Sequence, residues 1–289
     1  MMKNNYILLP VYNDFQSLKK VLKILNESFK YLKSKNHILV VNDHSSIKIK
    51  LDDKYRNFKS LKILNLRNNV GSQKAIFFGL KYLDKQIKNK NNQSIISVLD
   101  SDGEDDPKKL IQLIRRARER KDYFIFASRK RRTENFFLKS LNQIRLLVNF
   151  ILTGKFINFG NFSSFSSMLL KKILSNNNLY LAYSSGVLKN YNKFIFVDVK
   201  KNKRLHGKSK VNLNFLINHS IKIISIFHEE VFLRSLLIST LCLFFLEPYN
   251  YKYVIIIFFI INITLFYVNF FLKPKKVNLS IIKDVEKYF

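Results

Sequence analysis

The stretch SIISVLDSDGEDDP, residues 94–107, runs from an apolar segment through an acidic turn to the start of a helix. Ile95–Leu99 is a short run that is apolar except for Ser97, which is typical of a buried strand. Asp106 followed by Pro107 is typical of a helix N-terminus, because Asp caps free N–H groups and Pro fits the first helical position. In the turn between them, three carboxylates stand at every second position: Asp100, Asp102 and Glu104. A strand, a polar turn and a helix in succession predict one unit of an α/β sheet.

Strand-like and helix-like patterns alternate around this stretch over the first 130 residues. We expect strands at Tyr6–Pro10, His37–Val41, Leu61–Leu66, Ile95–Leu99 and Tyr123–Ser128. We expect helices over Phe15–Leu32, over Gln73–Leu83 and from Asp106 to about Arg120. Strands separated by single helices imply a mostly parallel sheet with helices on both faces. Ligands bind beyond the carboxyl ends of the strands in such sheets, so the residues that follow each strand form the candidate site.

The composition limits the class of protein. The 289 residues include 51 Lys and Arg against 20 Asp and Glu, a formal net charge of +31, and 47% of them are hydrophobic. That hydrophobic content excludes a fully disordered polybasic chain. Cys242 is the single cysteine, so an internal disulfide and a structural zinc domain are excluded as well. The positive charge suits nucleic acid, an anionic membrane surface or a phosphate-bearing small molecule, and charge alone does not choose among them.

Two apolar segments lie in the last fifth of the sequence. Tyr253–Leu272 has no charge over 20 residues, about the length that crosses a bilayer. Val231–Leu246 is apolar apart from Arg234, whose charged end can reach the membrane interface. Together they predict a membrane hairpin that turns at Glu247–Asn250, and a pair of buried core helices is the alternative.

Flanking charges predict how this hairpin is oriented. Three lysines follow the second segment and the turn carries only Lys252, so we expect both chain ends in the cytoplasm and the molecule in the inner membrane. Apolar residues at helical spacing between Asn212 and Phe227 predict an amphipathic helix at the interface, or else a helix packed on the preceding domain. The expected organisation is a cytoplasmic domain over 1–210, an amphipathic juxtamembrane segment over 211–230, two transmembrane helices within 231–272 and a basic cytoplasmic tail over 273–289.

Polar motifs follow the predicted strands. They are VYND at 11–14, VNDHSS at 41–46, NNVGSQKA at 68–75, DSDGEDDP at 100–107 and, later, RLHGKSK at 204–210. Carboxylates two apart in a turn offer the oxygen ligands that suit Mg²⁺ or Mn²⁺ holding a diphosphate, with helix capping and solvated charge as the alternative. The last motif offers a Gly and several donors that suit a phosphate, or else forms a basic surface loop.

In this order, the five motifs resemble those of family 2 glycosyltransferases. They are most similar to the dolichol-phosphate mannosyltransferase-like branch, which transfers a sugar from a nucleotide donor to a polyprenyl phosphate. The resemblance runs from about Tyr6 to Lys210 and implies a GT-A-like, Rossmann-like fold. It also implies a nucleotide-sugar donor, a polyprenyl phosphate acceptor and Mg²⁺ or Mn²⁺ as cofactor. A homo-oligomer stays possible, and no nucleic-acid partner is expected.

The resemblance implies roles for individual residues. Those expected at the nucleotide-sugar are Pro10, Tyr12, Asp14, Asp43, Gly71, Lys74 and Asp100. Those expected to hold the metal ion are Asp100, Asp102 and Glu104, and Asp102 is also an expected catalytic residue. Arg129 is the other catalytic candidate, because it follows a predicted strand end and could stabilise the leaving group or contact the acceptor phosphate; a solvated member of the basic run 129–132 is the alternative. Those expected at the acceptor phosphate are Arg204, Ser209 and Lys210. Asn42 and His44 stand where the family usually has Asp and Gly, and the usual acidic residue of the region around 134–174 is not evident.

The sequence therefore predicts a membrane-anchored, metal-dependent glycosyltransferase that acts on a polyprenyl phosphate, with inversion at the sugar. Such an acceptor phosphate is already ionised at neutral pH, which explains why no general base is evident. The alternatives are a family 2 enzyme that acts on a surface polysaccharide or a lipid-linked glycan, a degenerate transferase that binds without turnover, and a non-catalytic protein that holds nucleic acid or anionic lipid.

Overall fold

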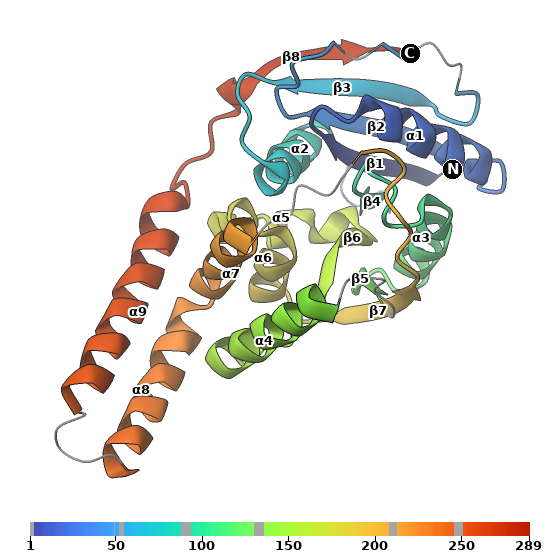
Figure 1. The fold of residues 1–289 in the computed structure, drawn as a ribbon. Coiled ribbons are helices and arrows are strands. Elements are labelled where there is room, and N and C mark those ends of the chain that lie inside the picture. The colour runs from blue at the N-terminus through green and yellow to red at the C-terminus, as the bar shows by residue number, and fades with distance from the viewer. Residues whose placement is uncertain are drawn as a thin grey trace.

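The computed structural model describes residues 3–48, 50, 51, 55–87, 94–129, 136–207, 213–245 and 251–289. Over these ranges the chain forms an eight-stranded sheet with helices on both faces and a pair of long helices that project from it (Figure 1). The strands are β1 (Lys3–Val11), β2 (Ser34–Asn42), β3 (Ser60–Leu66), β4 (Ile95–Val98), β5 (Phe124–Arg129), β6 (Phe159–Ser166), β7 (Phe194–Val199) and β8 (Ile282–Lys287).

The sheet has the order β7-β5-β6-β4-β1-β2-β3-β8. Strands β4, β1, β2 and β3 run parallel to one another, and β5 runs parallel to β7. Strand β6 lies antiparallel between β4 and β5, and β8 lies antiparallel to β3 at the edge. This mostly parallel mixed sheet confirms the predicted α/β fold class.

Two apolar layers hold the helices against the sheet. Helices α1 (Phe15–Phe29) and α3 (Leu110–Glu119) cover one face, and α2 (Ser72–Gln86), α5 (Leu170–Ile173) and α6 (Tyr183–Asn190) cover the other. Ile7 and Leu9 of β1 point into the first layer and Leu8 into the second, because successive side chains of a strand face opposite sides. Short 3₁₀ turns lie at Pro107–Lys109, Ser167–Leu169, Ser175–Tyr180 and Leu279–Ile281.

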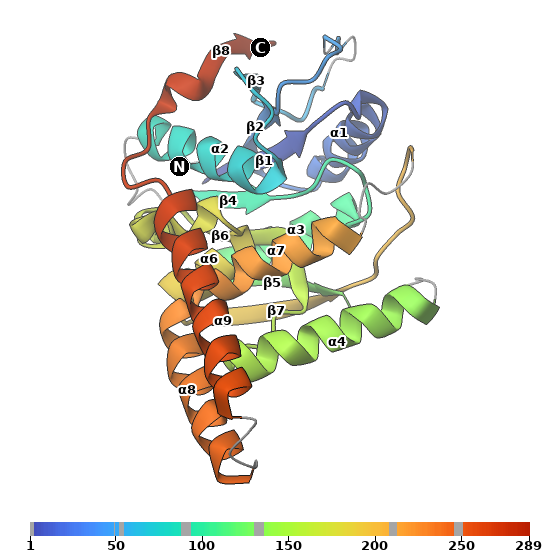
Figure 2. The same ribbon diagram turned by 60° about the vertical axis from the view of Figure 1, so that its left-hand side comes forward.

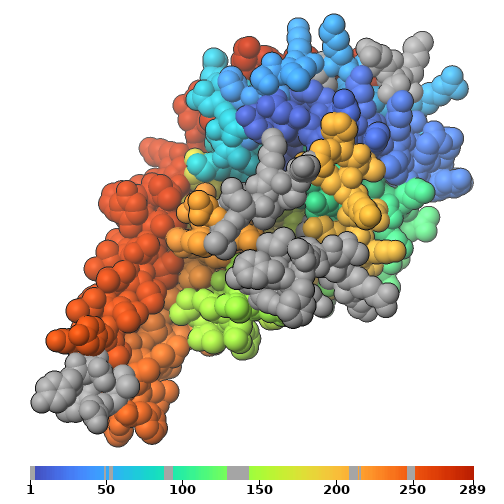
Figure 3. Space-filling model, viewed as in Figure 1, coloured from blue at the N-terminus to red at the C-terminus, as the bar shows by residue number. Residues whose placement is uncertain are grey.

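The described chain contains four further helices: α4 (Phe136–Thr153), α7 (Leu213–Ile226), α8 (His228–Phe245) and α9 (Tyr251–Leu272). A third apolar cluster joins α6, α7, α8 and α9, and includes Leu181, Ile224, Phe227, Val231 and Leu265. Lys189 of α6 forms ion pairs with Glu229 at 3.0 Å and Glu230 at 2.8 Å at the start of α8. The projecting helices are therefore packed on the sheet domain at their base (Figure 3).

Helix α9 is the one helix among the described ranges that is long and apolar enough to cross a membrane, with a mean hydropathy of 2.5. It coincides with the second predicted span. Helix α8 covers the first predicted span but also carries Glu229, Glu230 and Arg234, and it does not meet the same criterion. The predicted turn at Glu247–Asn250 lies outside the described residues. Only 17% of the apolar window of α9 is buried, so α9 is not a core helix of this chain.

Part of the predicted basic tail, residues 273–289, forms a strand of the sheet in the structure. Residues 282–287 form β8, whose Ile282 and Val285 pack against the apolar layer beneath β3. The side-chain amide of Asn65 on β3 donates to Asp284 at 2.6 Å and to Glu286 at 2.9 Å. The chain thus leaves the sheet after β7, forms α7, α8 and α9, and returns to the opposite edge of the same sheet.

Removal of residues 279–289 is expected to destabilise the whole sheet domain. Five partly buried apolar side chains of this segment lose their contacts, at a cost of about 5 kcal/mol in the free energy of unfolding. Chemical denaturation of purified protein measures this loss, and Lys283→Gln, an exposed change on the same strand, is the control. Equal stability of the truncated and full chains would contradict the pairing of β8 with β3.

Candidate active site

The acidic turn after β4 is fixed to the end of β1. The hydroxyl of Ser101 is buried and donates to the main-chain oxygen of Pro10 at 2.7 Å. The main-chain N–H of Leu99 donates to the oxygen of Leu8 at 3.1 Å. Because these contacts are short and local to the strand ends, the carboxylates of the turn meet the residues that follow β1, as the parallel arrangement predicts.

The segment that follows β7 lies across this turn. The main-chain N–H groups of Asn202 and Leu205 donate to the main-chain oxygens of Glu104 at 2.8 Å and Asp102 at 3.0 Å. Lys201 forms an ion pair with the carboxylate of Glu104 at 2.9 Å. Gly103 has a φ of 76°, and a Cβ there would collide with the side chain of Leu205, so this close approach requires glycine.

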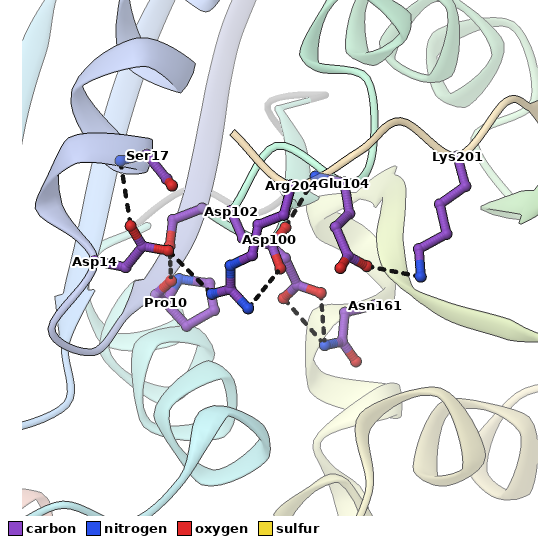
Figure 4. Close-up of polar contacts among 10 residues, drawn as sticks. Pro10, Asp14, Ser17, Asp100, Asp102, Glu104, Asn161, Lys201 and Arg204 are labelled. Atoms are coloured by element: carbon purple, nitrogen blue, oxygen red, sulfur yellow. Dashed lines mark hydrogen bonds and ion pairs between the residues drawn. The ribbon is translucent and has the colours of Figure 1, made fainter. Parts of the chain in front are cut away.

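Arg204 lies between two carboxylates from different strand ends, as Figure 4 shows. Its Nη2 is 3.0 Å from Asp14, and its Nη1 is 3.9 Å from Asp102. The other oxygen of Asp14 caps α1 by accepting from the N–H of Ser17 at 3.3 Å. Arg204 was predicted at the acceptor phosphate, and here it contacts the carboxylates predicted at the donor. A cationic group already positioned at this edge can also contact the phosphates of a donor.

Burial raises the pKa of the Asp102 carboxyl above its usual value of 3.8. The hydrogen bond from the N–H of Glu104, at 3.0 Å, acts in the opposite direction, and so does the charge of Arg204. The carboxylate of Glu104 acts in the same direction as burial. Because the pKa is raised overall, the N–H of Glu104 and the charge of Arg204 do not fully replace the hydration that the Asp102 carboxylate loses on folding.

The three-carboxylate metal site predicted from the sequence is not formed as expected. Glu104 turns away to Lys201, and no group of three or more His, Cys, Asp or Glu side chains placed to hold a metal ion occurs within the described ranges. Asp100 and Asp102 remain as candidate ligands. Two carboxylates fit Mg²⁺ or Mn²⁺ when a bound diphosphate supplies further oxygens, because Mg²⁺ is commonly held by one or two carboxylates and substrate phosphates.

Asp43 connects the ends of β2 and β3. Its side chain is 2% exposed, and its two oxygens accept from the N–H groups of Val70 and Gly71, both at 2.8 Å. Burial raises the pKa of Asp43, and these two hydrogen bonds oppose the rise. Asp43 was predicted to contact the nucleotide directly; the structure gives it the additional role of holding the turn before α2, where Gly71 adopts a φ of 87°.

Asn42 and His44, the two departures from the family motif, each have a specific local structural role. Asn42 donates to the side-chain oxygen of Asn65 at 2.8 Å and accepts from the N–H of Ser45 at 3.1 Å, so it joins neighbouring strands. His44 adopts a φ of 58°, in the left-handed region where glycine is favoured. The usual Gly of the motif therefore matches a backbone requirement that His44 meets with some strain.

The structure describes some of the other predicted site residues and not others. Tyr12 is 41% exposed at the end of β1, and Nζ of Lys74 lies 4.6 Å from the ring centre of Tyr180. The main chain of Arg129 ends β5 opposite Val199, and its side chain lies outside the described part of the structure. Ser209 and Lys210 also lie outside the described residues.

Two residues of this edge, Asn161 and Gln73, were not predicted from the sequence. The side-chain amide of Asn161, at the start of β6, donates to both oxygens of Asp100 at 3.2 and 3.4 Å (Figure 4). Gln73, in the first turn of α2, donates to the side-chain oxygen of Asn161 at 3.2 Å. The unusual run of polar residues in the buried strand β6 was the available signal, because buried polar side chains need specific partners.

The mostly parallel sheet and the acidic turn after β4 agree with the GT-A-like glycosyltransferase expected from the sequence. Residues 6–177 match the sequence model of Glycosyl transferase family 2. The chain belongs to this family.

Three comparisons place the chain among known proteins. It is 30% identical over 135 residues to an uncharacterized glycosyltransferase of Synechocystis sp., a match that covers 46% of this chain and 40% of that relative. A crystal structure of S. aureus TarS in complex with UDP is similar over 79% of this chain and 65% of that one, with 16% identity and a TM-score of 0.47. Glucosyl-3-phosphoglycerate synthase from Mycobacterium tuberculosis, in complex with uridine diphosphate, is similar over 79% and 80%, with 12% identity and a TM-score of 0.46.

Replacement of the partly buried Asp102 carboxylate is expected to stabilise the protein. The raised pKa means that folding disfavours the ionised form of Asp102, so the stability of the natural chain falls as pH rises from 3.8 through the folded-state pKa. Asp102→Asn should therefore raise the Tm at pH 7.5, and the gain should shrink as the pH approaches 4.

Thermal melting between pH 4 and pH 8 measures this effect. Asp122→Asn is the matched control, since Lys193 lowers the pKa of that exposed carboxyl and its replacement should bring no gain. A lower Tm for Asp102→Asn than for the natural chain at pH 7.5 would show that the Asp102 charge stabilises the fold.

Proposed function

We propose that this glycosyltransferase moves a sugar from a nucleoside-diphosphate sugar to a polyprenyl phosphate at a membrane surface, as in the dolichol-phosphate mannosyltransferase-like branch. The observation that carries the proposal is the continuity between the apolar helix pair and the transferase sheet. Helix α9 exposes most of its apolar side chains, yet it packs at its base on α7 and leads into β8 of the sheet. A lipid-embedded element is thereby attached to the sheet that carries the candidate site.

The donor side of the proposal rests on the edge formed by Asp14, Asp102 and Arg204. Departure of a nucleoside diphosphate from the sugar leaves negative charge on the diphosphate. Arg204 can stabilise that charge, and Mg²⁺ or Mn²⁺ held by Asp100 and Asp102 would supply further electrostatic stabilisation. The turn held by Asp43 presents the start of α2, whose N-terminal N–H groups favour anions.

The acceptor side rests on the exposed apolar surface of α4. This helix runs across the direction of α8 and α9 in Figure 2. Its exposed large apolar side chains are Ile144, Leu147, Val148, Phe150 and Ile151. If α9 crosses the bilayer, α4 lies along the surface of that bilayer and its apolar side faces the lipid. A polyprenyl phosphate would then meet the domain with its charged end at the interface.

In the proposed reaction, an oxygen of the acceptor phosphate attacks the anomeric carbon of the donor sugar. The new bond joins that oxygen to the sugar, and the bond from the anomeric carbon to the diphosphate breaks, so the nucleoside diphosphate leaves with the electron pair. Attack from the opposite face inverts the configuration. The phosphate is already ionised at neutral pH, so no side chain has to remove a proton.

The proposed location is the inner membrane, with the sheet domain in the cytoplasm. Lys273, Lys275 and Lys276 directly follow α9 and lead back to the sheet, so the sheet and this basic segment share one side. Basic residues beside an apolar span favour the cytoplasmic side.

Full-length protein in detergent should transfer radiolabel from one of a panel of UDP-, GDP- and dTDP-sugars to undecaprenyl phosphate in the presence of Mg²⁺ or Mn²⁺. Label that moves into organic solvent measures the transfer. Asp102→Asn should lower the rate by about 100-fold or more, the size expected when a group that stabilises the transition state is lost. Asp122→Asn, the same change at an exposed position, should retain the natural rate.

The remaining outcomes separate the alternatives. Donor binding with label only in a longer, water-soluble glycan would move the acceptor from a lipid phosphate to a polysaccharide. Donor binding with no transfer to any acceptor would indicate a degenerate transferase. Absence of binding to every donor, with protein that melts cooperatively, would overturn the nucleotide-sugar site itself.

A further inference from the structure

Four groups that are far apart in the sequence form a line of hydrogen bonds that ends at Asp100. The main-chain N–H of Tyr183, at the start of α6, donates to the side-chain oxygen of Gln73 at 2.7 Å. Gln73 donates through Nε2 to Oδ1 of Asn161 at 3.2 Å. Asn161 donates through Nδ2 to the two oxygens of Asp100 at 3.2 and 3.4 Å. The line therefore connects α6, α2, β6 and the acidic turn.

The groups at the two ends fix the donor-to-acceptor direction of these hydrogen bonds. A main-chain N–H can only donate, so the oxygen of Gln73 has to face Tyr183 and its NH₂ group has to face Asn161. Asn161 then presents its oxygen to Gln73 and its NH₂ group to Asp100, which as a carboxylate can only accept. Reversal of either amide would place two donors or two acceptors opposite each other. We call this line of hydrogen bonds from Tyr183 to Asp100 the relay, and it presents an N–H group to Asp100.

The first group of the relay is rigid. Tyr183 is fully buried, and its hydroxyl shares a hydrogen bond of 2.7 Å with Ser163. The Ser163 hydroxyl also contacts the main-chain oxygen of Asn161 at 3.0 Å, so the same tyrosine supports Asn161 from a second direction. Gly186 in α6 has no space for a side chain, because a Cβ would lie 2.5 Å from the main-chain nitrogen of Leu179. The position of α6 is therefore fixed against the preceding turn.

We propose that Gln73 and Asn161 are positioning residues that orient the carboxylate of Asp100 at the donor edge for binding a divalent cation together with a nucleoside diphosphate. The proposal rests on the donor part of the proposed function. Neither residue has to touch the sugar or the phosphates. Each acts through Asp100, as outer hydrogen-bond partners do around metal ligands in other proteins.

Gln73→Glu tests the direction of the relay with almost no change of shape. The new carboxylate still accepts from the N–H of Tyr183 but has no N–H for Asn161. The Asn161 amide then turns its NH₂ group to the new carboxylate and its oxygen to Asp100, which reverses the relay and repels Asp100. The matched control is Gln112→Glu, which makes the same chemical change on the exposed side of α3.

Titration of Mn²⁺ into the full chain, followed by electron paramagnetic resonance with UDP, GDP or dTDP present, is the measurement. Gln73→Glu should raise the Kd for Mn²⁺ by about 10-fold or more, the range found when an outer partner of a metal ligand is removed. Gln112→Glu should bind as the natural chain does. Transfer by Gln73→Glu should recover at high Mn²⁺ concentration, because Asp100 itself is retained.

Asn161→Ala is the second variant, because it removes the last N–H of the relay without adding charge. It should also weaken Mn²⁺ binding, at a Tm close to that of the natural chain. Unchanged Mn²⁺ affinity in both variants, or no Mn²⁺ binding by the natural chain, would overturn the proposal. Lipid labelling by the natural chain tests the proposed function separately, so a failure there is distinguishable from a failure of the relay.

Discussion

The gathering of negative charge at one edge of the sheet is the constraint on which the rest of this structure depends. Asp14, Asp100, Asp102 and Glu104 meet there because parallel strands end at the same edge, and like charges at short range repel. Each carboxylate has a donor from a later part of the chain. Arg204 contacts Asp14 and Asp102, Asn161 contacts Asp100, and Lys201 contacts Glu104. The segments β6 and 200–205 are placed where these contacts require them.

Strands β1 to β5 and helices α1 to α3 were predictable because their patterns are local. Each has its own apolar periodicity, and the cap at Asp106 and Pro107 lies within one turn. Strands β6, β7 and β8 were not predicted. The serines of β6 look like a loop until Ser164 is paired with the hydroxyl of Ser97, and β8 becomes a strand only through contact with β3, more than 200 residues earlier. The carboxylates of the site were found from their motifs, whereas the partner of Glu104 and the relay through Gln73 depend on the tertiary fold.

The candidate site and the apolar helices share structural supports. Helix α6 begins the relay to Asp100 and, at its other end, anchors α8 through Lys189. The side-chain amide of Asn269, buried in α9, donates to the main-chain oxygen of Ser225 in α7 at 2.8 Å. Buried polar contacts of this kind fix one arrangement of helices, because each leaves unpaired polar groups when the helices shift. A change in the tilt of α9 would therefore disturb the contacts of α7 and α6 before it altered the candidate site.

The return of the chain to β3 has a consequence for biogenesis. A ribosome completes α8 and α9 before it releases β8, so the edge of β3 stays unpaired until both helices have been synthesised. An open strand edge in a nascent chain is a site for aggregation, and chains fold from the N-terminal side as they are made. The sheet therefore reaches its final form only after the helix pair has been synthesised.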